Sequence, residues 1–307
     1  MNTASPLSPP QVAALSAALC AQHGSAFSGF AAQPCPTPQQ DDPAYRAALA
    51  AASQLGFIAA DAHSIAQAWG AQSRRQGRFD PAQWPSAAPD FGLHLRASGP
   101  AFAACPQTLG LYAVLPDADW VARMAQAGVP TLQLRCKAQD RSVIRQQVRA
   151  AVAAVQGTGA RLFINDHWQE ALEAGAYGLH LGQEDLDALP PERLELLRAS
   201  GLRLGVSTHG YAEMLRASQA RPSYIALGAV FPTTLKKMAT APQGLARLAA
   251  YARLAQDYPL VAIGGIALEQ FPAVRATGVG SIAVVRALVA APDPEAAAAQ
   301  LLAAMAA

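Results

Sequence analysis

The sequence predicts an α/β fold: a parallel (β/α)8 barrel preceded by a mainly helical extension. From about residue 110 onward, short apolar runs alternate with amphipathic stretches such as VIRQQVRAAVAAV and PERLELLRAS, in which apolar residues recur three and four positions apart. Repeated strand–helix alternation is typical of a closed barrel, and no G-x-G-x-x-G follows the first run, as an open dinucleotide-binding sheet would require. The eight predicted strands are residues 111–115, 131–135, 161–165, 178–181, 203–207, 224–228, 260–264 and 281–285.

The first third of the chain has a different pattern. Pro-rich breaks (PLSPPQ, PCPTPQQDDP and WPSAAPDF) flank one helix-like region from Tyr45 to about Gly77, and strand-like runs are few. We therefore predict two parts: residues 1–109, a helical extension and linker, and residues 110–307, the barrel.

Composition limits the classes of partner. With 52% hydrophobic and 14% charged residues, the chain of 307 residues is globular. Its net charge of +2 gives no basic field, so no nucleic acid is expected. No apolar run approaches the roughly 20 residues that span a bilayer, and VAALSAALCA lacks the basic flank of a signal peptide, so no membrane partner is expected. A homo-oligomer is left open.

The cysteines indicate the cellular compartment, and the lysines indicate candidate phosphate-binding loops. Four cysteines form no C-x-x-C pair or zinc spacing, which predicts free thiols and a cytoplasmic location. Only three of the 23 basic residues are Lys, at positions 137, 236 and 237. Because Lys is a compact point charge suited to phosphate, these two short segments are candidate phosphate-binding loops, with chance placement in exposed loops as the alternative.

Polar groups follow most of the predicted strands. In a (β/α)8 barrel the C-terminal strand ends converge on one mouth, where the site lies. The groups expected there are Gln133, Arg135, Lys137, Asn165, Asp166, His180, Asp185, Ser207, His209, Thr233, Thr234, Lys236, Gly264, Gly265, Val284 and Val285.

The two carboxylates among them suggest a metal. Arg135, Lys137 and Lys236 can neutralise phosphate oxygens, while Asp166 and Asp185, from adjacent strands, can share one hard cation. Mg²⁺ accepts oxygen ligands and is usually bound by one or two carboxylates plus substrate phosphates. The alternative is that each Asp is simply a helix N-cap.

Two further groups of residues at the predicted mouth give weaker indications of function. Gly264-Gly265 and the end of the last strand stand where barrels often bind phosphate, although Gly-Gly alone marks a turn. His180, Ser207 and His209 suggest nucleophilic catalysis, but no G-x-S-x-G surrounds Ser207 and the set does not suit zinc. We therefore do not expect a hydrolytic triad, and a packing role for His180 is an alternative.

Residues 109–306 closely resemble the thiamine-phosphate synthases. The resemblance rests on long strings in the same order: QLRCK, RLFINDHW, YGLHLGQED, RLGVSTH, RPSYIALGAVFPT, APQGL, VAIGGI and VGSIAVV. It implies a transferase of thiamine biosynthesis that joins hydroxymethylpyrimidine diphosphate to a thiazole phosphate, plain or carboxylated, with small molecules as its partners. It also implies a dissociative reaction, in which pyrophosphate leaves first and the thiazole nitrogen captures a pyrimidine carbocation.

The resemblance also implies residue roles. Arg135, Lys137, Asn165 and Lys236 would bind the diphosphate, with Mg²⁺ on Asp166 and Asp185. Lys236, Ser207 and Arg135 are the candidate catalytic groups. The pyrimidine would contact Gln133, His180 and Ser207, and the thiazole phosphate would contact Thr233, Gly265 and the backbone near Val285.

The sequence departs from the family pattern at two positions. The family's F-P-T-x-T-K segment here reads Phe-Pro-Thr-Thr-Leu-Lys, so Leu235 replaces a hydroxyl expected near the diphosphate, a loss worth roughly 1.5–3 kcal/mol unless Thr234 restores it. Arg286 stands where Ser is common. Two rival readings stay open: a thiazole tautomerase-like barrel, which needs no diphosphate site, and a catalytically inactive ligand-binding regulator.

The extension has a resemblance of its own. Residues 44–72 are similar to the C-terminal helix region of hydroxymethylpyrimidine-phosphate kinases, which would make the extension a degenerate kinase remnant. No glycine-rich anion hole or catalytic Asp precedes this segment, so kinase activity is not expected. The alternative is a helical extension that caps the barrel or mediates dimer contacts.

Overall fold

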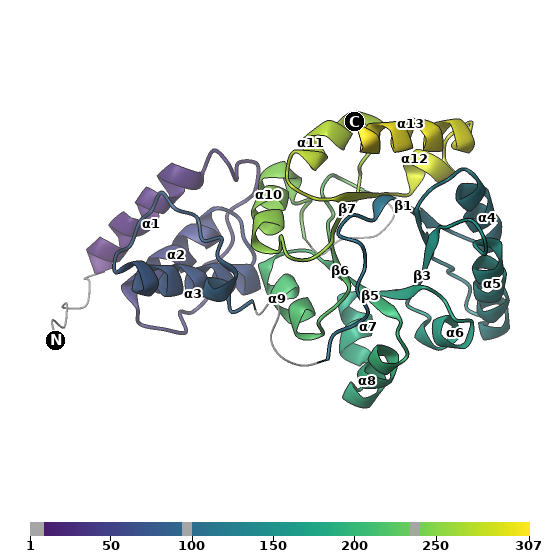
Figure 1. Cartoon of the computed structure of the whole chain (residues 1–307). Coiled ribbons are helices and arrows are strands. Elements are labelled where there is room, and N and C mark those ends of the chain that lie inside the picture. The colour runs from purple at the N-terminus through teal and green to yellow at the C-terminus, as the bar shows by residue number, and fades with distance from the viewer. Residues whose placement is uncertain (1–8, 94–99, 234–239) are drawn as a thin grey trace. The chain divides into compact units, whose positions relative to one another are not determined.

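The structure is a computed structural model that describes residues 9–93, 100–233 and 240–307 (Figure 1). Its contacts divide the chain into two compact units. The first unit comprises residues 1–96 and 210–216, and the second comprises residues 97–209 and 217–307. The boundary at residues 109–110 stays a prediction of where an independently folding barrel begins.

The second unit is a closed barrel of eight parallel strands, which confirms the predicted fold class. Each strand pairs with its neighbours in sequence, and the first pairs with the last through Tyr112 opposite Ala283. All eight strands begin and end within one residue of their predicted bounds. They are β1 (Gly110–Leu115), β2 (Thr131–Leu134), β3 (Arg161–Asn165), β4 (Gly178–Leu181), β5 (Arg203–Thr208), β6 (Tyr224–Leu227), β7 (Leu260–Ile263) and β8 (Ser281–Val284).

Helices follow the strands around the barrel (Figure 1). Asp117, Asp140 and Asp293 cap three of them, each accepting a hydrogen bond from a backbone N–H of the first turn. The helices are α4 (Ala118–Gln126), α5 (Arg141–Ala154), α6 (Trp168–Glu173), α7 (Gln183–Ala188), α8 (Pro191–Ala199), α9 (Tyr211–Gln219), α10 (Gly244–Leu254), the 3-10 turn η2 (Leu268–Gln270), α11 (Phe271–Arg275), α12 (Arg286–Val289) and α13 (Pro294–Ala306).

Aromatic rings fill the barrel interior. Tyr112, Phe163 and Tyr224 are almost fully buried and pack against one another, with ring centroids 5.1–6.0 Å apart. Two glycines make room for them. A Cβ on Gly205 would lie 2.1 Å from the Tyr224 ring, and one on Gly178 would lie 2.4 Å from the Phe163 ring. Small residues on β4 and β5 therefore accommodate large ones on β3 and β6.

The segment before β1 belongs to the second unit and packs against the barrel. Phe102 is buried and donates its N–H to the Arg221 carbonyl (3.2 Å). Ser223 donates its hydroxyl to the carbonyl of Ala103 (2.6 Å). Cys105 packs against the aromatic core of the barrel, and burial raises the pKa of its thiol to about 11. This segment therefore contributes to the barrel's stability although it forms no strand.

The first unit is helical, as predicted, but its helices differ from the expected single region. The segment from Tyr45 to Gly77 forms two helices, because Gly56 adopts a positive φ of 81° between them, and a Cβ there would lie 2.4 Å from Phe30 Cβ. A further helix precedes them and was not predicted, since its Ala-rich sequence is only weakly amphipathic. The helices are α1 (Pro9–His23), α2 (Pro43–Gln54), α3 (Ala59–Gln76) and the 3-10 turn η1 (Ala88–Phe91).

Residues 210–216 belong to this first unit. Asp61 accepts a hydrogen bond from the N–H of Ala212 (2.9 Å), and Trp84 Nε1 donates to the hydroxyl of Tyr211 (3.0 Å). The ring of Phe91 stacks on Tyr211 with centroids 4.9 Å apart. No helix in the described ranges is both long enough and apolar enough to cross a bilayer.

Candidate active site

A cavity of about 830 Å³ lies at the C-terminal ends of the barrel strands. All the predicted site residues that the structure describes line it: Gln133, Arg135, Lys137, Asn165, Asp166, His180, Asp185, Ser207, Thr233, Gly265 and Val285. Thr234, Leu235, Lys236 and Lys237 lie outside the described residues. The parallel barrel explains this convergence, because it points every strand's C-terminal end toward one mouth.

Neither Asp166 nor Asp185 caps a helix, in contrast to the three capping aspartates. The N-cap of α6 is His167 and the N-cap of α7 is Gly182, and neither makes a side-chain capping bond. Asp166 itself has a left-handed φ of 63°. Such a backbone is uncommon outside glycine and often marks a functional position. The N-cap alternative is therefore wrong for both residues.

The two carboxylates repel each other. Burial, the charge of Asp185 and a hydrogen bond with Asp185 together raise the pKa of Asp166 to about 6, against the opposing effects of His167 and Arg135. Asn165 adds a hydrogen bond from its side-chain amide to Asp166. Holding both carboxylates ionised side by side therefore requires a compensating positive charge.

This donor set fits a magnesium ion. Carboxylate oxygens are hard ligands, and Mg²⁺ is commonly held by one or two of them, with water and substrate phosphate completing its shell. Among the described residues, no group of three or more His, Cys, Asp and Glu side chains is arranged to hold a metal by itself. Asp166 and Asp185 are thus suited to a cation that arrives together with a phosphate ligand.

Two cations, Arg135 and Lys137, lie in the loop after β2, on the same wall as these carboxylates. Arg135 donates its backbone N–H to the Leu115 carbonyl (2.8 Å), which continues the pairing of β1 and β2 by one residue. Lys137 is exposed at the mouth. The wall therefore carries both signs of charge, as a site for a metal–phosphate pair requires.

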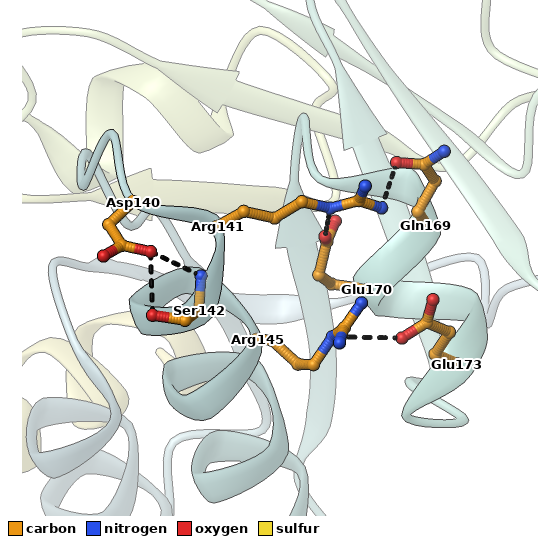
Figure 2. Close-up of polar contacts among 7 residues, drawn as sticks. All are labelled: Asp140, Arg141, Ser142, Arg145, Gln169, Glu170 and Glu173. Atoms are coloured by element: carbon orange, nitrogen blue, oxygen red, sulfur yellow. Dashed lines mark hydrogen bonds and ion pairs between the residues drawn. The ribbon is translucent and has the colours of Figure 1, made fainter.

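Ion pairs join α5 to α6, the helices that follow β2 and β3 (Figure 2). Arg141 donates through Nε to Glu170 Oε1 (2.8 Å) and through Nη2 to Gln169 Oε1 (2.5 Å). One turn further along α5, Arg145 pairs with Glu173 (3.3 Å). The first pair involves a buried carboxylate, whereas both partners in the second are over 40% exposed.

The loop after β2 is held at both ends. Asp140 caps α5 by accepting the N–H two residues further on (2.7 Å), as Figure 2 shows. His167 donates from Nε2 to the carbonyl of Cys136 (3.2 Å). Because Cys136 lies between Arg135 and Lys137, this bond ties the cationic loop to the turn before α6.

A neutral half of the cavity lies beside the charged wall, above a row of buried polar groups. Gln133 Nε2 donates to Tyr112 Oη (3.1 Å), which lies 2.7 Å from Tyr224 Oη. His180 follows, with Nδ1 2.6 Å from Tyr224 Oη and Nε2 2.8 Å from Ser207 Oγ. Burial, followed by the charge of Arg135, lowers the pKa of His180 to about 3, so the ring is neutral.

The opposite wall is built from β7 and β8. Gly264 and Gly265 have positive φ angles of 103° and 67°. A Cβ on Gly265 would lie 2.5 Å from the carbonyl oxygen of Pro232, so the segment that carries Thr233 passes directly over this turn. Only glycine fits such a close approach of two backbones.

Sequence reasoning missed Tyr112 and Tyr224. Tyr112 is the third residue of β1 and Tyr224 is the first residue of β6, so neither lies at a C-terminal strand end. A signal was present, because a buried tyrosine normally needs a partner for its hydroxyl. Their partners are far apart in sequence, however, and the closed barrel is needed to bring them together.

Comparison with known proteins agrees with this geometry. A family model described as thiamine monophosphate synthase matches residues 111–288. A thiamine-phosphate synthase from Neisseria meningitidis serogroup A is 56% identical over 188 residues, covering 61% of this chain and 90% of the relative. One from Escherichia coli O6:H1 is 55% identical over 203 residues, covering 66% of this chain and 95% of the relative.

Among solved structures, a thiamine phosphate pyrophosphorylase from Pyrococcus furiosus is similar, with a TM-score of 0.57 and 28% identity over 64% of this chain and 96% of that one. The matched family model covers more than half of the chain, and the relatives are covered almost completely. The chain therefore belongs to the thiamine-phosphate synthase family of transferases, which make thiamine phosphate.

Proposed function

We propose that this chain joins 4-amino-2-methyl-5-hydroxymethylpyrimidine diphosphate to a hydroxyethylthiazole phosphate, plain or carboxylated, and releases pyrophosphate. The observation that carries the proposal is the division of one cavity into a charged wall and a neutral half. The charged wall suits a diphosphate with its metal, and the neutral half suits an uncharged heteroaromatic ring. The cytoplasmic location inferred from free thiols stays a prediction.

The charged wall would stabilise the leaving group. Asp166 and Asp185 would hold Mg²⁺, which neutralises charge on the diphosphate when bound. Arg135 and Lys137 would bind the diphosphate oxygens, and Asn165 would orient Asp166. Lys236 is assigned to the same diphosphate-binding role from the sequence alone. These groups act by positioning and by charge, so the carbon–oxygen bond breaks before the new bond forms.

The neutral half and the wall built from β7 and β8 would hold the two rings. Gln133 and Ser207 would orient the pyrimidine, while Thr233, Gly265 and the backbone at Val285 would hold the thiazole phosphate. The thiazole nitrogen would then be directed at the carbocation left by departure of pyrophosphate. A cavity that encloses both rings limits competing capture by water.

The test is turnover of Asp166→Asn and Asp185→Asn across a magnesium titration. We expect each to lose more than about 100-fold in kcat/KM, the upper end of what losing a metal's outer partners costs. Asp187→Asn, an exposed carboxylate on the same helix as Asp185, is the control and should retain wild-type kinetics. Near-normal rates for either test variant would rule out the two-carboxylate metal site.

A thiazole tautomerase-like activity and an inactive regulator are the rival functions. Neither needs the carboxylates and cations that share one wall of this cavity. Measuring pyrophosphate release separates the synthase from both rivals, because only the synthase produces it, and assaying thiazole isomerisation separates the two rivals from each other.

A further inference from the structure

The row of buried polar groups beneath the neutral half runs from Gln133 through Tyr112, Tyr224 and His180 to Ser207. Each hydrogen bond along it has a defined donor and acceptor, and we call this direction the proton order. Tyr112 and Tyr224 are at most 1% exposed, so their hydroxyl protons have only the row itself as partners. Buried hydroxyls without an acceptor are costly, so each proton in the row goes to the next group. The order can therefore be derived from one end of the row.

Gln133 sets the direction. Its Nε2 can only donate, so Tyr112 Oη accepts that hydrogen bond and donates its own O–H to Tyr224 Oη. Tyr224 in turn donates to His180 Nδ1, which must then be unprotonated. The single proton of a neutral imidazole is therefore on Nε2 and points at Ser207 Oγ.

The neutral state of His180 is the second requirement. Its ring is buried, and burial together with the nearby charge of Arg135 lowers its pKa to about 3. Both ring nitrogens already have protein partners, so His180 acts on a ligand through Ser207. Ser207 accepts a hydrogen bond from His180 Nε2–H, which leaves its own O–H free to donate into the cavity.

We infer that Tyr224 is a positioning residue that holds His180 as its Nε2–H tautomer and so makes Ser207 a hydrogen-bond donor to an acceptor atom of the ligand. Neither Tyr224 nor Tyr112 is among the residues lining the cavity. A ring nitrogen of an aminopyrimidine is an acceptor of this kind, and this identification of the ligand rests on the proposed function. The tautomer itself does not depend on it.

The opposite proton order predicts the other tautomer of His180. If the Gln133 amide were turned around, Tyr112 would donate to its oxygen, His180 would carry its proton on Nδ1, and Ser207 would donate to Nε2. Ser207 would then only accept from a ligand. The two orders are distinguished by which ring nitrogen of His180 is protonated.

The first measurement is ¹⁵N NMR of the histidine rings in the full-length, ligand-free protein. The His180 signals are identified by their loss in His180→Asn. We expect an unprotonated Nδ1 and a protonated Nε2 at neutral pH. A protonated Nδ1 would overturn the inference. This measurement needs no tyrosine variant, so it stands even if Tyr224→Phe does not fold.

Variants then test the cause. Tyr224→Phe removes the donor to Nδ1, so the Nδ1–H tautomer should become populated. Tyr112→Phe leaves Tyr224 with Nδ1 as its remaining partner, so the Nε2–H tautomer should persist. Tyr177→Phe is the packing control, because Tyr177 packs edge-on against Phe163 in the same core (5.4 Å), while its hydroxyl interacts with Cys105 and Arg161 rather than with the row. An unchanged tautomer in Tyr224→Phe would contradict the assigned role.

A double-mutant cycle connects the tautomer to the reaction. Tyr224→Phe should lower kcat/KM for the pyrimidine diphosphate by about three- to tenfold, the loss expected for one neutral hydrogen bond. In a Ser207→Ala background the same change should cost less than twofold, because the tyrosine acts through that hydroxyl. Equal losses in both backgrounds would show that Tyr224 serves packing alone.

A failure of the proposed function can be distinguished from a failure of this inference. A wild-type protein with the expected tautomer but no thiamine phosphate formation would contradict the function and leave the proton order intact. Full synthase activity in a protein whose His180 carries its proton on Nδ1 would support the proposed function and contradict the proton order.

Discussion

Asp166 combines a left-handed backbone, a partly buried side chain and a second carboxylate beside it. The left-handed backbone is uncommon for residues other than glycine, and both the burial and the neighbouring carboxylate disfavour the ionised side chain. The resulting pKa of about 6 lies above the ordinary value of 3.8, so the folded metal-free protein binds a proton that the unfolded chain has already lost over this range.

This shift predicts the sign of a pH effect. The stability of the metal-free protein should fall as pH rises from about 4 to 6, because Asp166 must ionise beside Asp185 in the folded state. Asp166→Asn should flatten this part of the profile. Chemical denaturation at a series of pH values measures it, and a wild-type profile as flat as the variant's would contradict this account of Asp166.

Leu235 allows a gain-of-function prediction from sequence alone. Leu235→Thr would supply the hydroxyl that the resemblance to the family's F-P-T-x-T-K segment leads us to expect near the diphosphate. We expect KM for the pyrimidine diphosphate to fall by up to about tenfold, the equivalent of roughly 1.5 kcal/mol for a hydrogen bond to a charged group. Unchanged kinetics would show that Thr234 already supplies that bond, and Thr234→Val would then be the variant that loses affinity.

At the scale of elements, α5 and α6 support the loop that carries Arg135 and Lys137. Glu170 is 6% exposed at its side chain and pairs with Arg141. Burial raises the pKa of Glu170, but the hydrogen bond and charge of Arg141 outweigh it, so the net pKa is lowered. The carboxylate therefore depends on Arg141 for its compensation.

Arg141→Ala should destabilise the protein by about 1–3 kcal/mol, because it leaves a buried carboxylate without its partner. It should also raise KM for the pyrimidine diphosphate more than it lowers kcat, since the cationic loop loses its anchor. Arg145→Ala removes the exposed pair one turn away, visible beside it in Figure 2, and should change stability by less than about 1 kcal/mol. Equal effects of the two variants on KM would disprove a specific role for Arg141.

Strand positions were predictable because short β-rich runs between amphipathic stretches leave few alternatives, and the site residues followed from the strand ends. The break at Gly56 was missed because the apolar pattern of α2 continues into α3. The buried row from Gln133 to Ser207 was missed for a different reason. Tyr112 and Tyr224 meet across the barrel interior, and no local pattern specifies a contact between residues that distant in sequence.

At the scale of the whole molecule, truncation tests the boundary between extension and barrel. A chain beginning at Pro100 retains Phe102 and Cys105 and should fold and make thiamine phosphate. A chain beginning at Thr108 should also be active but less stable by about 2 kcal/mol, because it loses the buried Phe102 side chain. Urea denaturation compares the two.

Both truncations remove the partners of Tyr211 in the first unit, so reduced solubility is expected. A soluble, folded chain beginning at Pro100 without synthase activity would show that the extension contributes to the site.

The central claim is that this barrel releases pyrophosphate as it forms thiamine phosphate. The most direct measurement incubates the purified full-length protein with both substrates and Mg²⁺ and quantifies the two products together. The proposed function predicts thiamine phosphate and pyrophosphate in equal amounts, with both lost in Asp166→Asn. Isomerisation of the thiazole without pyrophosphate, or no product at all from folded protein, would contradict it.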